Sequence, residues 1–433
     1  MRDLITRFRR DEDGAMTAMS LYFVAIAAMV GGLAVDFAQR TERETWLQTA
    51  TDAAGHAALQ SRTTKSASAA LSDALSVAAA NLPVSVHGLA ILPSDITFGS
   101  WDADTRTFSA DATARDAVRV TGERSAARGN YVSNLLLHTL GYRGFELDTD
   151  AVFARQTPPC FREGFVAEAR VDLQSNNAFG ANFCIHGNDG VKLSSNSSFA
   201  DGSVVSMLDP ATLELPSSGM TSNPGLAEAL RYTHYPFHAI DSVPDTIADL
   251  LAGGASVPGY ISGLAGVTLP DRRLTPELVI PGRMHIALTC SGNQKLAIEA
   301  GHYDKFLLVT NCKVKFNQGV HLTDSVIATT NPDPKSLNAP SGLILGLDDS
   351  CAKGGGVTLL SAGGMEVASD LEIYGSQVVA MGDVTFSANA TGIEGASIIS
   401  GGTINSTSRI EMDGCPEDTN DGIVTEKIVR MVQ

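Results

Sequence analysis

Six cysteines are the residues of this 433-residue chain whose chemistry can be argued most directly from spacing. They form no C-x-x-C pair, the spacing typical of structural zinc sites and of thioredoxin-like redox sites. An even number favours disulfides in an oxidising compartment, although six cysteines allow fifteen pairings. The disulfide candidates are Cys160, Cys184, Cys290, Cys312, Cys351 and Cys415.

Two further groups have the residue types of a metal site but not its spacing. His234 and His238 have the i, i+4 spacing of a helical pair, but Pro236 lies between them and the glutamate of H-E-x-x-H is missing. Several carboxylates between residues 348 and 372 could offer oxygens to a hard cation, yet adjacent residues of a strand face opposite sides. These carboxylates are Asp348, Asp349, Glu366, Asp370 and Glu372, and Lys353 is the nearest basic residue to the first two.

The segment at 413–426, DGCPEDTNDGIVTE, is similar in composition to a calcium loop. With Glu417 as position one, Asp421 and Gly422 fall where the loop needs them, but position twelve is Ile428 instead of Glu. No G-x-S-x-G, P-loop or G-x-G-x-x-G occurs with the flanks it needs. We therefore expect no catalytic residue, no cofactor and no metal, and a protein that is not an enzyme.

The N-terminus predicts how the chain is positioned in the cell. Residues 14–35 carry no charge, and as a helix these 22 residues rise about 33 Å, enough to cross a bilayer core. Four arginines precede this run, whereas only Arg40 and Arg43 follow it closely, which predicts a cytoplasmic tail at 1–13 and an exported body. A cleaved secretory signal is the alternative, but its apolar region is usually shorter and ends at an A-x-A site. We expect a single-pass inner-membrane protein whose bulk is periplasmic.

Charge and composition exclude two other classes of protein. The net charge of −17 would repel a phosphate backbone, so nucleic acid is not an expected partner. Hydrophobic residues make up 44% of the chain, which argues against wholesale disorder.

Helix-forming residues continue without a proline through 36–81, which predicts a periplasmic extension of the membrane helix. A stripe of mostly small residues repeats along this predicted helix at steps of three and four residues. It either packs on its own domain or meets a partner's helix. The stripe is Trp46, Leu47, Ala50, Ala54, Ala57 and Ala58.

Residues 82–157 read as a small α+β domain. We expect strands at 84–92, 95–101, 106–110, 117–123 and 145–155, and a helix near 130–140.

An internal repeat predicts the architecture of residues 158–420. LQSNNAF at 173–179 matches LSSNSSF at 193–199, and VVAMGDVTFSA at 378–388 aligns with IISGGTINSTS at 398–408, each at an offset of 20 residues. Short β-runs at this period are typical of a right-handed parallel β-helix, with a β-sandwich as the alternative. A helical insertion is expected at about 209–283, with helices at 223–235 and 245–254, and a C-terminal tail at 421–433.

The repeat also suggests cysteine pairs. Cys160 to Cys184 and Cys290 to Cys312 are each about one turn of the β-helix, and stacked strands about 4.8 Å apart suit a disulfide. Cys351 to Cys415 is about three turns, so that pair requires the tail to fold back.

The first 155 residues resemble the TadE/TadG-like family of the tight-adherence (Tad, or Flp) pilus assembly system, and the TadG branch in particular. The resemblance rests on RRDEDGAMTAMSL, the single apolar helix, Asp36 just past it, and LQTATDAAGHAA at 47–58, which contains Asp52. DITFGSWD at 95–102 and AVRVTGER at 117–124 look like the family's periplasmic strands. Pilin-like branches carry a Glu five residues after the glycine at which prepilin peptidase cuts. Counted from Gly14 that position is Met19, so the helix is expected to stay whole.

This resemblance implies a structural or assembly role in a Tad pilus machine. It makes Asp36, Trp46, Leu47, Asp52 and Ala54 the candidate residues for helix packing or assembly. The implied partners are the inner-membrane platform, pilin-like subunits and the secretin side. An adhesin exposed on the pilus or cell surface, and an envelope-anchored carbohydrate-active enzyme on a β-helix, are the alternatives.

Overall fold

The computed structural model describes residues 13–407, 409–415 and 422–433. Contacts divide the chain into two compact units: the first holds residues up to 156 together with 427–433, and the second holds 157–426. We describe each unit separately.

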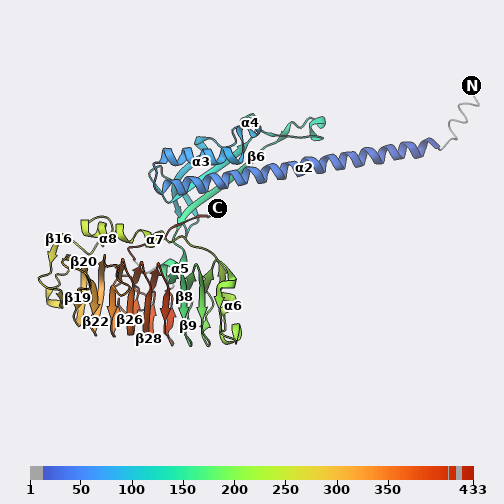
Figure 1. Cartoon of the computed structure of the whole chain (residues 1–433). Coiled ribbons are helices and arrows are strands. Elements are labelled where there is room, and N and C mark those ends of the chain that lie inside the picture. The colour runs from blue at the N-terminus through green and yellow to red at the C-terminus, as the bar shows by residue number, and fades with distance from the viewer. Residues whose placement is uncertain (1–12, 408, 416–421) are drawn as a thin grey trace, which may run out of the picture. The chain divides into compact units, whose positions relative to one another are not determined.

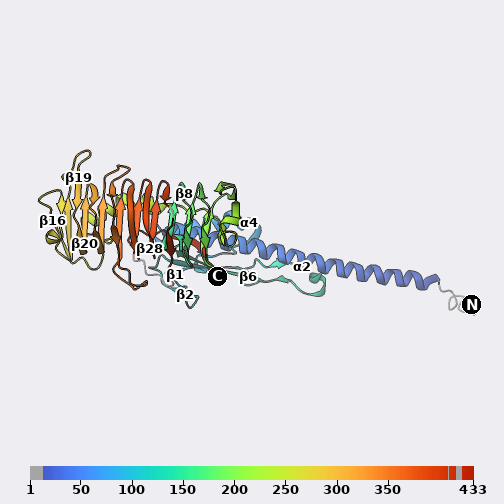
Figure 2. The same cartoon turned by 90° about the horizontal axis from the view of Figure 1, so that it is seen from below.

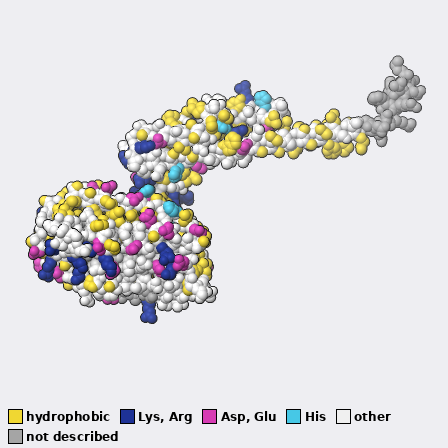
Figure 3. Space-filling view, in the orientation of Figure 1, with side chains coloured by type: hydrophobic (Ala, Val, Ile, Leu, Met, Phe, Trp, Pro, Cys, Tyr) yellow, Lys and Arg dark blue, Asp and Glu magenta, His cyan; other side chains and the backbone are white. Residues whose placement is uncertain are grey.

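The first unit is built on one long helix, α2 (Asp13–Arg62), followed by α3 (Ala67–Asn81). The N-terminal part of α2 projects alone, and its apolar side chains are exposed (Figures 1 and 3). Within the described residues, one helix is long and apolar enough to cross a membrane by length and composition, Met16–Arg62. The expectation of a long apolar N-terminal helix is therefore confirmed.

The helical extension predicted at 36–81 consists of two helices, because the chain turns back after Arg62. The buried Arg62 guanidinium donates to the carbonyl of Lys65 (3.1 Å), which holds the turn. Ser66 then caps α3, since its hydroxyl accepts from the backbone N–H of Ala69 (3.3 Å). The segment after Asp36 therefore forms two helices that pack against each other.

A five-stranded antiparallel sheet packs against these helices, in the order β2-β1-β3-β6-β32. Its last strand was not expected, because the sequence predicts a tail at 421–433. Residues 428–431 instead pair with 153–156, which completes the edge of the sheet. The strands are β1 (Ile96–Asp102), β2 (Thr107–Ala110), β3 (Ala117–Arg124), β6 (Leu147–Gln156) and β32 (Ile428–Met431).

Two further predictions for this unit are wrong. The strand expected at 84–92 begins as a short helix, α4 (Val84–His87), because Pro83 fixes the turn before it and Gly88 ends it with a φ of 70°. The helix expected near 130–140 is absent. That segment holds β4 (Val132–Ser133) and a single 3-10 turn, η2 (Leu137–Leu140), and returns through β5 (Gly144–Phe145). Another short turn, η1 (Pro93–Asp95), precedes β1.

The second unit is a 25-stranded sheet system, and the strand pairs of its described residues are parallel (Figure 1). The early strands, before the chain leaves the stack, are β7 (Gly164–Ala167), β8 (Arg170–Leu173), β9 (Ala178–Phe179), β10 (Cys184–Gly187), β11 (Gly190–Leu193), β12 (Ser198–Phe199), β13 (Val204–Met207), β14 (Leu213–Glu214) and β15 (Leu230–Tyr232). The later strands are β16 (Gly263–Thr268), β17 (Arg273–Leu274), β18 (Arg283–Ala287), β19 (Lys295–Ile298), β20 (Gly301–Thr310), β21 (Lys313–Phe316), β22 (Val320–Thr329), β23 (Leu337–Ala339), β24 (Leu343–Leu345), β25 (Val357–Ser361), β26 (Met365–Tyr374), β27 (Gln377–Ala380), β28 (Val384–Glu394), β29 (Ser397–Ser400), β30 (Ile404–Ser406) and β31 (Glu411–Asp413). The helices and 3-10 turns are α5 (Pro159–Arg162), α6 (Leu226–Ala229), α7 (His238–Asp241), α8 (Val243–Ala252), η3 (Pro210–Thr212), η4 (Gly219–Ser222) and η5 (Pro276–Leu278).

The repeat offset found in the sequence equals the sequence separation between paired residues of neighbouring strands in this sheet. Leu173 pairs with Leu193, and Val378 pairs with Ile398. The asparagines of the first repeat occupy turns: Asn176 and Asn196 have φ values of 65° and 64°, a region that asparagine tolerates better than most residues. The prediction of a parallel sheet with this period is confirmed.

The stack is not assembled in chain order. Strands β29, β30 and β31 pair with β7, β8 and β9, so the last repeat lies beside the first. The spatial order therefore runs from β16 at one end, through β31 and β7, to β15 at the other (Figures 1 and 2).

The segment predicted as an insertion at 209–283 is the connection that this order requires. Its middle part, with α7 and α8, runs from the β15 end to the β16 end, and α8 lies against β20 and β25. Its two ends are strands of the sheet, so a pure insertion is wrong. The helix expected at 223–235 is limited to α6, because residues 230–232 pair with β13 as a strand. The helix expected at 245–254 corresponds to α8.

Three disulfides fasten the second unit. Cys160–Cys184 and Cys290–Cys312 join neighbouring turns of chain, with Cα atoms 4.8 and 5.1 Å apart. Cys351–Cys415 spans 64 residues, with Cα atoms 5.8 Å apart. Cys351 follows β24 in a loop that reaches the chain just beyond β31.

Candidate functional site: the junction between the long helix and its unit

The small-residue stripe of α2 packs against its own unit. Leu47, Ala50, Ala54 and Ala58 are all fully buried in one core with α3, β3 and β6. The fit is close at Gly55, where a β-carbon would lie 2.6 Å from the ring of Phe153. Of the two readings left open by the sequence, the stripe thus belongs to the unit's own core.

Asp36 lies near the N-terminal end of the part of α2 that contacts its own unit, and its side chain is fully buried. Its carboxylate accepts three consecutive backbone N–H groups: Leu135 donates to Oδ1, and Leu136 and Leu137 donate to Oδ2, the last two at 2.9 Å. These donors open the 3-10 turn η2, where backbone N–H groups have no partner within the turn. A single side chain of the long helix therefore holds a segment that lies far along the chain.

This capture explains why residues 130–140 do not form an α-helix. The N–H groups of 135–137 point to Asp36 instead of to preceding carbonyls. Asn130 fixes the start of the segment, because its side-chain amide donates to the carbonyls of Leu89 (3.1 Å) and Glu123 (3.2 Å). Helix propensity is overridden by these tertiary hydrogen bonds.

The protonation state of Asp36 follows from the same contacts. Burial raises the pKa of its carboxyl group, but the N–H groups of Leu137, Leu135 and Leu136 stabilise the charged form and lower it more, so the net pKa lies below the ordinary value. Asp36 is therefore a carboxylate at neutral pH, which the three donors require.

The segment held by Asp36 forms an arm, residues 131–145, that lies along α2 (Figures 1 and 2). Leu136 packs on Gly32, where a β-carbon would lie 2.8 Å from its side chain. The rings of Phe37 and Phe145 are 5.9 Å apart, and the Arg40 guanidinium lies 5.8 Å from the Phe145 ring centre. Sequence reasoning missed this arm because its contacts to α2 are far apart in sequence.

Trp46 and Asp52, the other candidates on α2, lie outside the core. Trp46 is 40% exposed; Arg43 lies 4.3 Å from its ring centre, and His87 meets it edge-on at 5.7 Å. Asp52 is half-buried and accepts from the side-chain amide of Gln48 (2.7 Å). Leu47 and Ala54 thus lie in the core of the first unit, and Asp36 binds the segment at 135–137. Trp46 and Asp52 lie nearer the surface of the unit.

The carboxylates considered for a cation do not converge on one point in the structure. Glu366 pairs with Lys335 (2.5 Å), and Glu372 accepts from the Tyr374 hydroxyl (3.2 Å). Asp370 accepts from Ser341 (3.0 Å), and Asp349 from the N–H of Ala352 (3.0 Å). The last two candidates, Asp348 and Lys353, are exposed.

One group of possible metal ligands does come together in the described chain: Cys351, Glu394 and Cys415. The two sulfurs are bonded to each other, so they are not free to bind a metal. The Glu394 carboxylate lies 3.2 Å from the sulfur of Cys351. Burial, and then the charges of Asp348, Asp413 and Asp349, raise its pKa.

The remaining metal candidates belong to no group of possible ligands in the described chain, or lie outside the described residues. His234 is exposed in a loop, and His238 opens α7 and is also exposed. The middle of the calcium-like segment, residues 416–421, lies outside the described residues.

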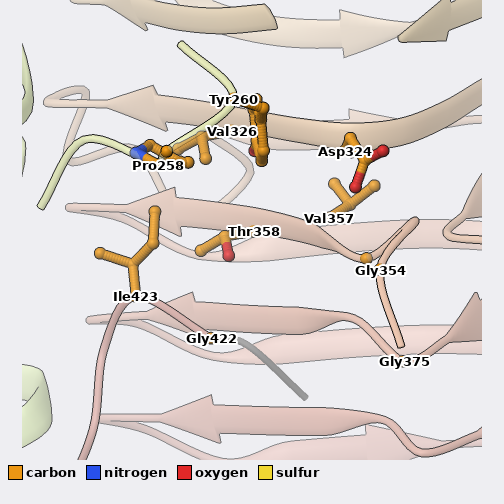
Figure 4. A pocket seen from close by; sticks show the side chains of 12 residues that line it. Pro258, Tyr260, Asp324, Val326, Gly354, Val357, Thr358, Gly375, Gly422 and Ile423 are labelled. Atoms are coloured by element: carbon orange, nitrogen blue, oxygen red, sulfur yellow. The ribbon is translucent and has the colours of Figure 1, made fainter. Parts of the chain in front are cut away.

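A cavity of about 460 Å³ in the second unit was not foreseen from the sequence. Figure 4 shows the side chains of Tyr260, Asp324 and Thr358, which come from three separate segments around it. The N–H of Gly355 donates to Asp324 (2.8 Å). Burial, and then Asp324 and Asp304, raise the pKa of the Tyr260 hydroxyl. The glycine run at 354–356, which lets the chain approach closely here, was the available signal.

Comparison with known sequences finds a matching family in each unit. Residues 164–416 match the family described as "Domain of unknown function (DUF7867)", and the chain belongs to this family. Residues 48–152 match the family described as "Putative Tad-like Flp pilus-assembly". The second match covers most of the stripe, the strands β1 to β3, part of β6 and the arm at 131–145, and it supports a role related to pilus assembly.

Other comparisons add little. No curated protein matches the sequence. The crystal structure of the competence-associated pilin ComZ from Thermus thermophilus aligns over 78% of this chain and 88% of its own, with 10% identity and a TM-score of 0.32. A TM-score this low defines no shared fold.

Proposed function

We propose that this protein is a membrane-anchored periplasmic component of a Tad/Flp pilus assembly machine, with a structural role and no enzymatic activity, of the TadG branch of the TadE/TadG-like family. The observation that carries the proposal is the Tad-like match at 48–152. It falls on the unit that also bears the long apolar helix.

The geometry of the first unit supports anchoring. Residues 16–31 of α2 are exposed along their whole length, and most are apolar. Exposed apolar side chains of this extent are costly in water and are satisfied by a bilayer. The arginine bias supports a cytoplasmic N-terminus and a periplasmic body in the inner membrane.

For the second unit we propose a closed, right-handed parallel β-helix. The chain returns to parallel register at each repeat, and one continuous apolar core runs through the stack. Joining the last repeat to the first gives a rod whose ends are β15 and β16. Such a rigid rod suits a spacer or docking surface between the inner-membrane platform, pilin-like subunits and the secretin side.

Limited proteolysis of intact spheroplasts tests the anchoring. Protease added from outside should digest the chain beyond about Asp36 and leave a short stub protected by the membrane. A fusion tag at the N-terminus should stay protected until the membrane is permeabilised. A body that resists protease until permeabilisation would reverse the topology, and release of the intact protein from membranes would exclude an anchor.

A further inference from the structure

The arm, residues 131–145, presents apolar and aromatic side chains that nothing in the described chain covers. Leu135 is 65% exposed and Tyr142 is 67% exposed. The arm contacts α2 at Gly32, Asp36 and Phe37.

The position of these contacts along α2 sets their depth. If residues 14–35 cross the hydrocarbon core, which is about 30 Å thick, Gly32 lies within the last ~6 Å of the run before Asp36. The interfacial layer beyond the core is roughly 5–7 Å thick. Leu136, which touches Gly32, therefore reaches the boundary between acyl chains and headgroups.

Other exposed apolar residues of the unit lie too far out to share this position. Trp46 is ten residues beyond Asp36, a rise of about 15 Å. Val86 is 70% exposed, but its neighbour His87 packs on Trp46. Val86 and Trp46 therefore both lie beyond the interfacial layer. Of these exposed apolar side chains, those of the arm therefore lie at the depth of the membrane interface.

The chemistry of the arm and of the helix beside it also matches that of a membrane interface. Aromatic rings and basic side chains gather at this level: Phe37 and Arg40 lie near Phe145, and the backbone N–H of Tyr142, which precedes the exposed Arg143, donates to the carbonyl of Leu137 (3.0 Å). Such residues favour the headgroup region, with rings toward the acyl chains and cations toward phosphates. Asp36 would be costly at this depth as a bare carboxylate, and the three N–H donors from the arm offset that cost.

We propose that the arm is a membrane-surface element whose exposed Leu135 and Tyr142 insert into the outer interfacial layer of the bilayer that α2 crosses. The lipid surface is its partner, and Asp36 is the positioning residue that sets the arm's depth. This inference rests on the membrane anchoring proposed above.

Depth-dependent fluorescence quenching tests the arm. The background is the full-length protein with Trp46→Phe and Trp101→Phe, reconstituted in vesicles of phosphatidylcholine and phosphatidylglycerol. The phosphatidylcholine is brominated either near the carbonyl or near the chain end. Leu135→Trp and, separately, Tyr142→Trp should be quenched most by bromine near the carbonyl, and they should be shielded from aqueous iodide.

Three single substitutions in the same background serve as references. Val35→Trp should be quenched by a similar factor to Leu135→Trp, because both lie at one level. Val86→Trp, which is equally exposed but farther out, should be quenched by iodide and not by the lipid. Phe23→Trp reports the middle of the membrane helix and should be quenched most by bromine near the chain end.

These reference variants distinguish a failure of the arm proposal from a failure of the membrane anchor. Lipid quenching of Phe23→Trp with iodide quenching of both arm variants would overturn the arm proposal and leave the anchor intact. Iodide quenching of Phe23→Trp would overturn the anchor itself, and the arm proposal with it. Adding Asp36→Ala should release the arm, so that Leu135→Trp becomes accessible to iodide while Phe23→Trp is unchanged.

Discussion

Replacing Cys351 and Cys415 together by Ser is expected to lower the free energy of unfolding of the second unit by about 4 kcal/mol, more than the loss of either other disulfide. A disulfide stabilises chiefly by restricting the unfolded chain, and this restriction grows with the length of the closed loop. The Cys351–Cys415 loop spans 64 residues, whereas the Cys290–Cys312 loop spans 22. The three loops follow one another along the chain without overlap, so each can be removed independently.

Hydrogen exchange with mass spectrometry, on the full chain in detergent micelles, measures this effect. Both tryptophans, Trp46 and Trp101, lie in the first unit, so their fluorescence does not follow the second. The matched control is Cys290→Ser with Cys312→Ser, for which the loss is expected to be about 3 kcal/mol. If this control destabilised the strands of the second unit as much as the long-loop variant or more, loop length would not govern the contribution.

The second large effect is expected on acidification and is assigned to His186. This imidazole is fully buried between Ser206, whose hydroxyl lies 2.8 Å from Nδ1, and Asn188, whose Oδ1 lies 2.9 Å from Nε2. Nε2 therefore carries the proton and donates to Asn188, while Nδ1 accepts from Ser206. Burial lowers the pKa of His186 to about 4, and the nearby His234 acts in the same direction.

The sign of the pH dependence follows from this shift. Between pH about 6.5 and about 4 the unfolded chain binds a proton that the folded state refuses, so stability falls as the pH falls through this range. The contribution of neutral His186 to the free energy of unfolding is fully present above about pH 6.5. About 3 kcal/mol of it is lost by pH 4, since each pKa unit corresponds to 1.36 kcal/mol.

His186→Gln should flatten this part of the profile, because glutamine does not titrate. The readout is the difference between parent and variant in opening free energies of strands β10 and β13 from pH 7 to pH 4.5. Glu394 and Glu426 have raised pKa values, which act in the opposite direction in both proteins and cancel in the difference. The exposed His302→Gln is the control and should keep the parent's profile; an unchanged slope in His186→Gln would refute the assignment.

The parallel sheet was predictable because its period is written locally. Each repeat carries its own apolar positions and turn residues, so the offset between repeats appears in the sequence and reappears as the pairing of Leu173 with Leu193. The order of the stack was not predictable. Pairing of β29 with β7 joins segments from opposite ends of the second unit's sequence, and no local pattern distinguishes an end repeat from an internal one.

The candidate site was predictable in the same partial way. The stripe around Leu47 and Ala54 follows helical periodicity and was recognised as a packing face. Asp36 was singled out, but its three donors were not, because residues 135–137 look like a helix until their N–H groups find a distant carboxylate. The strand at 428–431 was missed for a similar reason: an isolated short strand is defined by its neighbour β6 and not by its own sequence.

Crosslinking in living cells, followed by purification of this protein under denaturing conditions and mass spectrometry, tests the proposed function most directly. Residues on the exposed face of the second unit, such as Lys335 and Arg273, offer sites for a photoreactive side chain away from the core. A role in pilus assembly predicts crosslinks to platform, pilin-like or secretin proteins of a Tad system, and their loss when residues 14–35 are replaced by a cleaved signal. Crosslinks to none of these proteins, at normal levels of the folded chain, would contradict it.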